Sequence, residues 1–306
     1  MFRKNLLLLL LLTAGLLYSQ DNEIANLLLH KTDAEIGNLK GKVKKIDEKK
    51  WAKTKIFSDG PLILKQTSSV LFDGKGMISE NYSQRPFKTY ENEELIEKQS
   101  YSHEVSKFDS KGRLINKRKY VGTFAGQKKI DTAAYFKMVY EYDEKSGGFS
   151  YQQFDVKGKK NSSFIVKTTD TPKIFETTKI NYKSHGMIVS SRIDAVSYFD
   201  QLNRLQKVDF SGSGGKAVME YFYDSAGNLI REMYQSKTSM DARKNEFTYN
   251  EKNNLQTLQR FSSKGPGESL VFDYQYDQKG NWIVKTGKDS RNGTITEKTE
   301  RKISYY

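Results

Sequence analysis

The chain has 306 residues, enough for one large β domain or two ordinary domains. Charged residues make up 29% and hydrophobic residues 36%, yet aromatic residues reach 12%, which excludes the aromatic-poor composition of a disordered chain. The formal net charge is +14 and cysteine is absent, so disulfides, thiol catalysis, thiolate metal sites and an amino-terminal lipid on cysteine are excluded.

The first twenty residues have the features of a signal peptide. Arg3 and Lys4 give a positive start, and an apolar stretch begins at Leu6 and ends near Leu17. A stretch of about a dozen residues suits a signal peptide and is shorter than the ~20 residues of a transmembrane helix. We therefore expect removal of residues 1–20, export to the periplasm, cell surface or exterior of a bacterium, and a mature chain that is not an integral membrane protein.

Residues 21–38 differ in character from the rest of the mature chain and are predicted to form a tether or a short helix. An alternating pattern of apolar and polar residues begins near Leu39. We see no second domain boundary after that point. Residues 39–306 are therefore predicted to form one domain of repeated β-hairpins.

A turn motif recurs along this domain. It consists of an aromatic residue, Asp, two variable residues and Gly, followed soon by a large apolar residue. The clearest copies begin at Phe72-Asp73, Phe108-Asp109, Phe154-Asp155, Tyr223-Asp224 and Tyr276-Asp277, and weaker copies begin at Tyr142-Asp143, Phe199-Asp200 and Tyr249-Asn250. In the weaker copies, the Gly position holds Ser146, Asn203 or Asn253.

The spacing of the motif predicts a specific turn. The Asp side chain can accept a hydrogen bond from the backbone two residues on, which closes an Asx-turn. The Gly or Asn three residues after the Asp then supplies the positive φ that returns the chain into an antiparallel partner with a bulge. We therefore interpret the recurring Asp residues as turn residues and not as calcium ligands, because Lys and Ala occupy the positions where a calcium loop needs oxygen.

The repeat length predicts the fold class. From Asp200 the turn recurs at Asp224, Asn250 and Asp277, at intervals of 24, 26 and 27 residues, which is two strands and two turns per repeat. Before the turns, aromatic residues alternate at period two, as in Tyr221 and Tyr223. The expected fold is an all-β, antiparallel β-meander of repeated hairpins, forming an extended curved or curled sheet that is open or a half-barrel.

The motif resembles the YD repeat of bacterial Rhs-type cell-surface proteins. The segments Tyr223-Asp224 with Gly227-Asn228-Leu229, and Tyr276-Asp277 with Gly280-Asn281-Trp282, carry this resemblance, which is best over residues 198–306. The resemblance implies a β-hairpin architecture and a setting in the cell envelope. The toxin role of Rhs proteins does not carry over.

No catalytic, cofactor-binding or metal-binding residue emerges from the sequence. The three histidines, His30, His103 and His185, have no ligand spacing, and no Gly-x-Ser-x-Gly elbow is present. Residues 213–216 and 285–287 match two β-lactamase signatures, but that mechanism needs the Ser at a helix start, and Ser213 falls in a predicted hairpin turn. We predict that the protein is not an enzyme and needs no cofactor.

Two other classes of function are disfavoured. The predicted export, and the spread of Lys over all repeats, argue against nucleic acid as a partner. A transmembrane barrel needs one wholly apolar parity in each strand. In the last strand, charge stands on both parities, with Glu297 and Arg301 on one and Lys298, Glu300 and Lys302 on the other.

Two hypotheses for function remain. The first is an exported, non-enzymatic repeat protein that presents a β surface to an envelope or extracellular partner, either an anionic polysaccharide or a surface protein; the mature chain keeps a charge of +12 after loss of Arg3 and Lys4. The second is a periplasmic carrier or chaperone that holds an apolar ligand in its curled sheet. An apolar concave pocket would favour the carrier, and a flat face rich in Lys would favour the binding surface.

Overall fold

The structure, a computed structural model, describes most of the predicted domain. The described residues are 38–53, 60–91, 94–125, 128–131, 135–145, 148–169, 173–182, 188–211 and 216–306. The predicted signal peptide, residues 21–37, Ser146, His30, His185 and Ser213 lie outside these residues.

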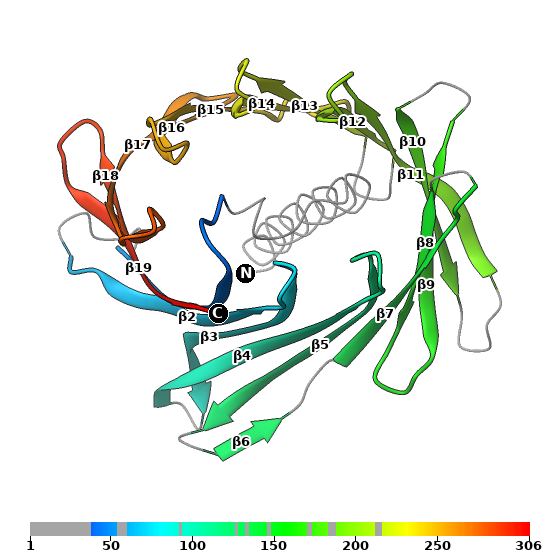
Figure 1. Ribbon diagram of the computed structural model, residues 1–306, viewed down its shortest axis with the longest axis horizontal. Coiled ribbons are helices and arrows are strands. Elements are labelled where there is room, and N and C mark those ends of the chain that lie inside the picture. The colour runs from blue at the N-terminus through cyan, green and yellow to red at the C-terminus, as the bar shows by residue number, and fades with distance from the viewer. Residues whose placement is uncertain are drawn as a thin grey trace.

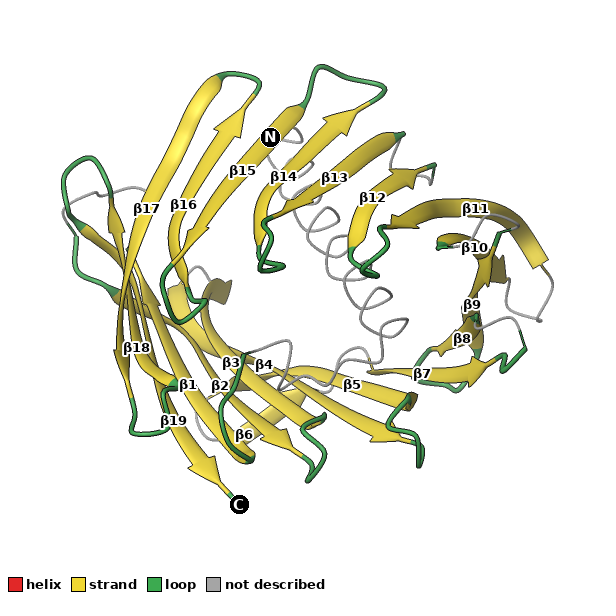
Figure 2. Cartoon of the chain, turned by 45° about the horizontal axis from the view of Figure 1, so that its top comes forward, coloured by secondary structure: helices red, strands yellow, loops and turns green. Residues whose placement is uncertain are grey.

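The described residues form nineteen β-strands, which the chain visits in order around a ring (Figures 1 and 2). Their bounds are β1 (Val43–Ala52), β2 (Ile63–Phe72), β3 (Ile78–Glu91), β4 (Glu94–Phe108), β5 (Leu114–Ala125), β6 (Lys128–Asp131), β7 (Tyr135–Tyr142), β8 (Phe149–Phe154), β9 (Lys160–Thr168), β10 (Ile174–Tyr182), β11 (Ile188–Phe199), β12 (Leu205–Phe210), β13 (Ala217–Tyr223), β14 (Leu229–Ser236), β15 (Ala242–Tyr249), β16 (Leu255–Ser262), β17 (Gly265–Tyr276), β18 (Trp282–Asp289) and β19 (Ile295–Tyr305). Within the described part of the chain, no helix has the length and apolar character that a membrane crossing requires.

The sheet is closed. Strand β1 pairs antiparallel with β19, so that Ile46 lies opposite Ile303, and β1 also pairs with β2. Strand β5 pairs with both β6 and β7, which follow one another along the same edge of β5. The short β6 therefore adds no position to the ring, which the other eighteen strands form.

The all-β, antiparallel meander was predicted correctly, but the prediction of an open sheet or half-barrel was wrong. Each hairpin carries its own turn signal in the sequence, whereas the β1–β19 contact joins the two ends of the domain with no turn between them. The alternation of apolar and polar residues along each strand therefore does not predict that pairing. Closure removes the two free edges that an open sheet would expose.

The two faces of the wall differ in burial. Opposed residues of an antiparallel pair share a face, so the register follows one face from Tyr140 through Tyr151 to Phe164. Followed further round the wall, the same face carries Val208 and Leu270, which are 0% and 2% exposed. Side chains converge on the concave side of a closed wall and diverge on its convex side, so this crowded face is the inner one.

The chain before β1 lies on the same side of the wall. Figure 1 draws the dark blue segment that leads into β1 within the ring. In that segment, Leu39 packs against Val43, Ile46 and Phe72, which belong to the crowded face. This contact agrees with the assignment of the crowded face to the inside of the barrel.

The outer face is charged. Its Lys and acidic residues form ion pairs between positions two apart on one strand, which share a face. Four such pairs have N···O distances of 2.7–3.0 Å: Lys45–Asp47, Lys207–Asp209, Lys244–Glu246 and Lys298–Glu300. One aromatic patch departs from this pattern, because Tyr101 is buried on the outer face, where its ring stacks with that of Tyr82.

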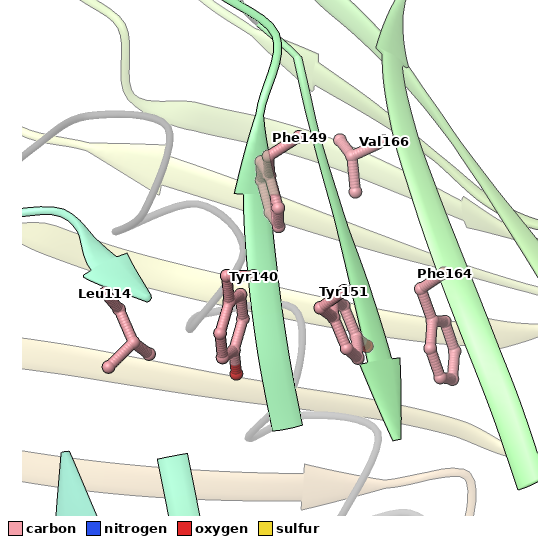
Figure 3. Packing of buried hydrophobic residues seen from close by; sticks show 6 residues of the cluster. All are labelled: Leu114, Tyr140, Phe149, Tyr151, Phe164 and Val166. Atoms are coloured by element: carbon pink, nitrogen blue, oxygen red, sulfur yellow. The ribbon is translucent and has the colours of Figure 1, made fainter. Parts of the chain in front are cut away.

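Among the described residues, the inner face carries four apolar clusters at intervals round the wall. The cluster shown in Figure 3 joins β5 and β7–β9, and in it the Tyr151 and Phe164 rings stack with centroids 4.6 Å apart. A second cluster surrounds Val208, a third Val43 and a fourth Leu270. Successive hairpins thus bury their aromatic residues toward the inside of one continuous wall.

Candidate functional site

The predicted turn geometry is confirmed. In the Asp73 turn, the side-chain oxygen accepts hydrogen bonds from the backbone of Lys75 and Met77, at 2.9 and 3.0 Å. The same arrangement recurs at Asp155, Asp200, Asn250 and Asp277. Positive φ occurs at the predicted turn positions Gly76, Gly112, Gly158, Asn203, Gly227, Asn253 and Gly280.

The turns are also joined from one repeat to the next, which the sequence reasoning missed. The Tyr223 hydroxyl donates to the backbone oxygen of Leu205, the apolar residue after the preceding turn, at 2.7 Å. Arg204 bonds to Asp200 in its own turn and lies over the Tyr223 ring, 4.8 Å from the centroid. The motif tyrosine and the residue four after the Asp therefore link neighbouring repeats.

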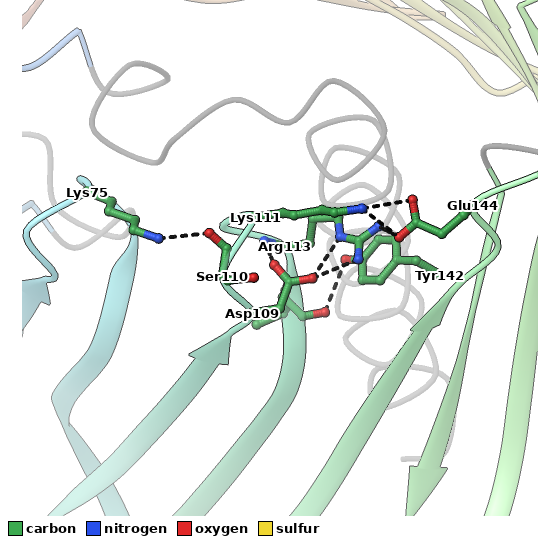
Figure 4. Close-up of polar contacts among 8 residues, drawn as sticks. Lys75, Asp109, Ser110, Lys111, Arg113, Tyr142 and Glu144 are labelled. Carbon is green, nitrogen blue, oxygen red and sulfur yellow. Dashed lines mark hydrogen bonds and ion pairs between the residues drawn. The ribbon is translucent and has the colours of Figure 1, made fainter.

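Figure 4 shows the same linkage at another turn. Arg113 donates to Asp109 at 2.8 Å and to Glu144 of the next turn at 2.7 Å, and Tyr142 donates to the Leu114 backbone oxygen at 3.0 Å. Burial would raise the pKa of Asp109, but the hydrogen bonds and charge of Arg113 outweigh it and hold the pKa below its usual range. These aspartates are therefore structural groups of the rim.

Side-chain hydrogen bonds of Asn281 and Asn38 fix the segment before β1 to this rim. Asn281 is 3% exposed; it accepts from the Lys40 backbone N–H at 2.7 Å and donates to the Lys40 backbone oxygen at 2.8 Å. Asn38 donates to the Lys252 backbone oxygen at 3.1 Å. A pocket of about 500 Å³ lies between this segment and the turns at residues 251–254 and 279–282. Its lining is mainly polar, and the segment itself forms one wall.

The strongest candidate for binding is a group of charged side chains on the inner face of β1, β18 and β19. Glu48, 9% exposed, bonds to Arg301 at 2.7 Å and pairs with Lys50 at 2.9 Å. Lys285 pairs with Glu297 at 3.7 Å. We call these five residues the inner charge cluster; it contains three cations and two carboxylates.

The inner charge cluster adjoins apolar and aromatic side chains. The Lys285 ammonium lies 3.9 Å from the centroid of the Phe272 ring, and the Arg301 guanidinium lies 3.3 Å from that of Trp282. Phe272 belongs to the apolar cluster around Leu270. Cations thus lie against ring faces, which attract them through the ring quadrupole.

Burial controls the ionisation of these groups. Burial lowers the pKa of Lys285, and the charges of Lys50 and Arg301 lower it further, against the opposing effect of Glu297. For Glu48, burial would raise the pKa, but Lys50 and Arg301 outweigh it and hold the pKa below its ordinary value. The cations thus stabilise the charge of Glu48, whereas burial and the neighbouring cations disfavour the charge of Lys285.

The residues that the sequence singled out for chemistry do not form a site among the described residues. His103 lies on the outer face with its Nε2 3.2 Å from Glu80. The Lys285-Thr286-Gly287 match lies in β18, with Lys285 on the inner face. In the described part of the chain, no three His, Cys, Asp or Glu residues are grouped to hold a metal ion.

No protein-family model matches the chain, and no curated protein matches its sequence. Solved structures with some likeness include a porin-like protein from Bacteroides uniformis, with a TM-score of 0.40, 11% identity, and coverage of 86% of this chain and 98% of that one. A porin-like protein from Bacteroides vulgatus has a TM-score of 0.27 with 11% identity and the same coverage. A TcdB2-TccC3-Cdc42 structure has a TM-score of 0.27 and 12% identity, with coverage of 76% of this chain but only 16% of that one. Likeness at this level carries no argument about function.

Proposed function

We propose that this protein is an exported, non-enzymatic carrier whose outer face is exposed to water and whose closed barrel holds an apolar ligand inside. The observation that carries the proposal is the difference between its two faces. The outer face carries ion pairs such as Lys207–Asp209, and the inner face carries apolar clusters such as that around Val208. This is the second of the two functions considered from the sequence, adapted to a closed sheet.

The distribution of charge supports an aqueous surrounding. A barrel in a membrane turns a band of apolar side chains outward, about 25 Å tall, and keeps polar groups inside. Here the outer face places ion pairs on β1, β12, β15 and β19. Export itself is supported by the positive start and apolar stretch of the first twenty residues.

The size of the ring supports an internal ligand. Barrels of eight strands are filled by their own side chains, whereas barrels of 16–18 strands are wide enough to leave a lumen. With eighteen strands in the ring, the inner wall presents half-buried rings such as Phe210, Tyr234 and Phe247 around its apolar clusters. An apolar ligand would lie against these rings.

Binding of an anionic polysaccharide at the outer face is less well supported. Several outer lysines pair with carboxylates on the same strand, as Lys45 does with Asp47, and Lys288 pairs with Asp273 of the neighbouring strand. Such pairs lower the local field that these lysines offer to a polyanion. The outer surface is also convex, which lowers the area that it can offer to a flat partner.

The two tryptophans allow a direct test, because they lie on opposite faces. Trp282 contacts Arg301 and Tyr274 on the inner face, whereas Trp51 lies opposite Lys298 on the outer face. We would titrate methyl 9,10-dibromostearate, a neutral contact quencher, into the single-tryptophan variants Trp51→Phe and Trp282→Phe.

The carrier proposal expects saturable quenching of Trp282 in the Trp51→Phe protein and little quenching of Trp51 in the Trp282→Phe protein. Equal quenching of both tryptophans would indicate adsorption to the outside. Absence of quenching in both variants would refute an internal apolar site.

A further inference from the structure

We propose that the inner charge cluster receives the anionic headgroup, a carboxylate or a phosphate, of an amphiphile whose apolar part lies against the cluster around Leu270. This inference rests on the proposed carrier function and names the class of its ligand. The residues that bind the headgroup are Lys285 and Arg301.

The charges of the cluster are unbalanced. Glu48 is shared between Arg301 and Lys50, at 2.7 and 2.9 Å. Lys285 has Glu297 at 3.7 Å, longer than the 2.7–3.2 Å of an ordinary N–H···O hydrogen bond. The cluster therefore contains three cations and two carboxylates, and the ion pair of Lys285 with Glu297 is long. One added anion would balance the charges.

The surroundings of Lys285 favour an amphiphile over a free anion. Its side chain is 22% exposed and lies against the Phe272 ring, and the neighbouring Arg301 lies against Trp282. A headgroup at Lys285 would thus place the attached chain beside Phe272 and Leu270, which are 5% and 2% exposed. In this low-dielectric setting a charge-assisted hydrogen bond is stronger than at an exposed site.

A second pair of inner cations provides a matched control. Lys117 and Lys119 both pair with Glu104, at 3.5 and 2.6 Å. The Lys117 side chain is 20% exposed, close to the value for Lys285, and it lies on the same inner face. Across the β5–β7 pair Lys117 lies opposite Met138, which packs against the cluster of Figure 3. The control therefore also places an inner cation beside apolar side chains, on a strand that is not adjacent to β18.

The test compares 9,10-dibromostearic acid with its methyl ester in the Trp51→Phe protein, with Trp282 as the reporter, below the critical micelle concentration. We expect the acid to bind at least roughly tenfold tighter than the ester, since a hydrogen bond to a charged group contributes about 1.5–3 kcal/mol. Lys285→Met should remove this preference, so that the acid and the ester bind this variant with similar affinity. Lys117→Met should preserve the preference.

Two further arms sharpen the result. Glu297→Gln removes the loose partner of Lys285 and should tighten binding of the acid severalfold, which tests the site even if Lys285→Met fails to fold. Competition by dodecanoate and by dodecyl phosphate then distinguishes a carboxylate headgroup from a phosphate headgroup.

Equal affinity of the acid and the ester in the parent protein would overturn the headgroup site and leave the carrier proposal intact. Equal losses in Lys285→Met and Lys117→Met would also overturn it, because any inner cation would then serve. Failure of both the acid and the ester to quench Trp282 would instead refute the carrier proposal itself.

Discussion

Replacement of Gly227 by valine should destabilise the protein through backbone strain alone. Gly227 has a φ of +91°, and a Cβ built on it meets no atom within 4 Å, so a side chain causes no clash. An L-residue in the left-handed region costs roughly 1–2 kcal/mol, and a β-branched residue is more strained than alanine. We therefore expect a loss of about 1 kcal/mol for Gly227→Ala and about 2 kcal/mol or more for Gly227→Val.

Thermal unfolding followed by circular dichroism measures these losses. One kcal/mol corresponds to a fall in Tm of roughly 2–4 °C for a large domain. The control is Ser225→Ala, an exposed change in the same turn. A second control is Asn253→Gly, which should be nearly neutral because Asn253 already occupies a φ of +57°. If Gly227→Val melts with the parent, the bulged turn does not limit stability and our reasoning is wrong.

Four further predictions concern other parts of the structure. Tyr223→Phe removes the hydroxyl that donates to the Leu205 backbone oxygen and should cost about 1 kcal/mol in urea unfolding. The pKa of Glu48 is lowered in the folded state, so its ionised carboxylate stabilises the folded protein above its unfolded pKa of about 4.5. This stabilisation is lost as the pH falls below that value. Glu48→Gln should therefore lose less stability than the parent between about pH 6 and pH 3. Asn281→Ala should speed amide hydrogen exchange at Lys40, whose two backbone groups it binds. Mass spectrometry of the exported protein should find an amino terminus near Gln20 or Asp21.

Each of these has an outcome that would contradict it. Tyr234→Phe is the control for the Tyr223 hydroxyl. Equal losses of stability in both tyrosine variants would show that the hydrogen bond from Tyr223 to Leu205 makes no specific contribution. An unchanged acid response in Glu48→Gln would assign acid sensitivity to other carboxylates. Slow exchange at Lys40 in Asn281→Ala would show that the segment is held elsewhere, and recovery of an intact Met1 in the membrane fraction would identify an uncleaved anchor.

The repeat architecture was predictable because its signals are local. Each Asp turn and each aromatic alternation is encoded by a stretch of about ten residues. The positive φ values at Gly112, Asn203 and Gly280 occur where the spacing predicted them. Closure depends instead on the pairing of Val43–Ala52 with Ile295–Tyr305, two segments that alternate like any others. The same is true of the link from Tyr223 to Leu205, which crosses between repeats.

The candidate site was hidden for a related reason. Lys285 stood out only as part of a chance motif, because burial beside Phe272 and proximity to Arg301 arise from strands that the closed sheet brings together. Glu48 and Arg301 are separated by 253 positions and meet only across the β1–β19 pair. The charges on both parities of β19, which argued against a lipid-facing strand, belong in the structure to two different settings: Arg301 to the inner charge cluster, and Lys298 and Glu300 to an outer ion pair.

The pairing of β1 with β19 restricts the barrel widths that gain or loss of strands could produce. The first and last strands of a meander are antiparallel only when the ring holds an even number of strands, and one repeat of 24–27 residues supplies two strands. Duplication or loss of a whole repeat would therefore keep the ends compatible, while the diameter would grow or shrink roughly in proportion to strand number. Loss of a single strand would leave the ends parallel and unable to keep their present ladder. Proteins that evolve from this sequence would thus differ in lumen size by fixed steps, and each step would correspond to one hairpin of two strands.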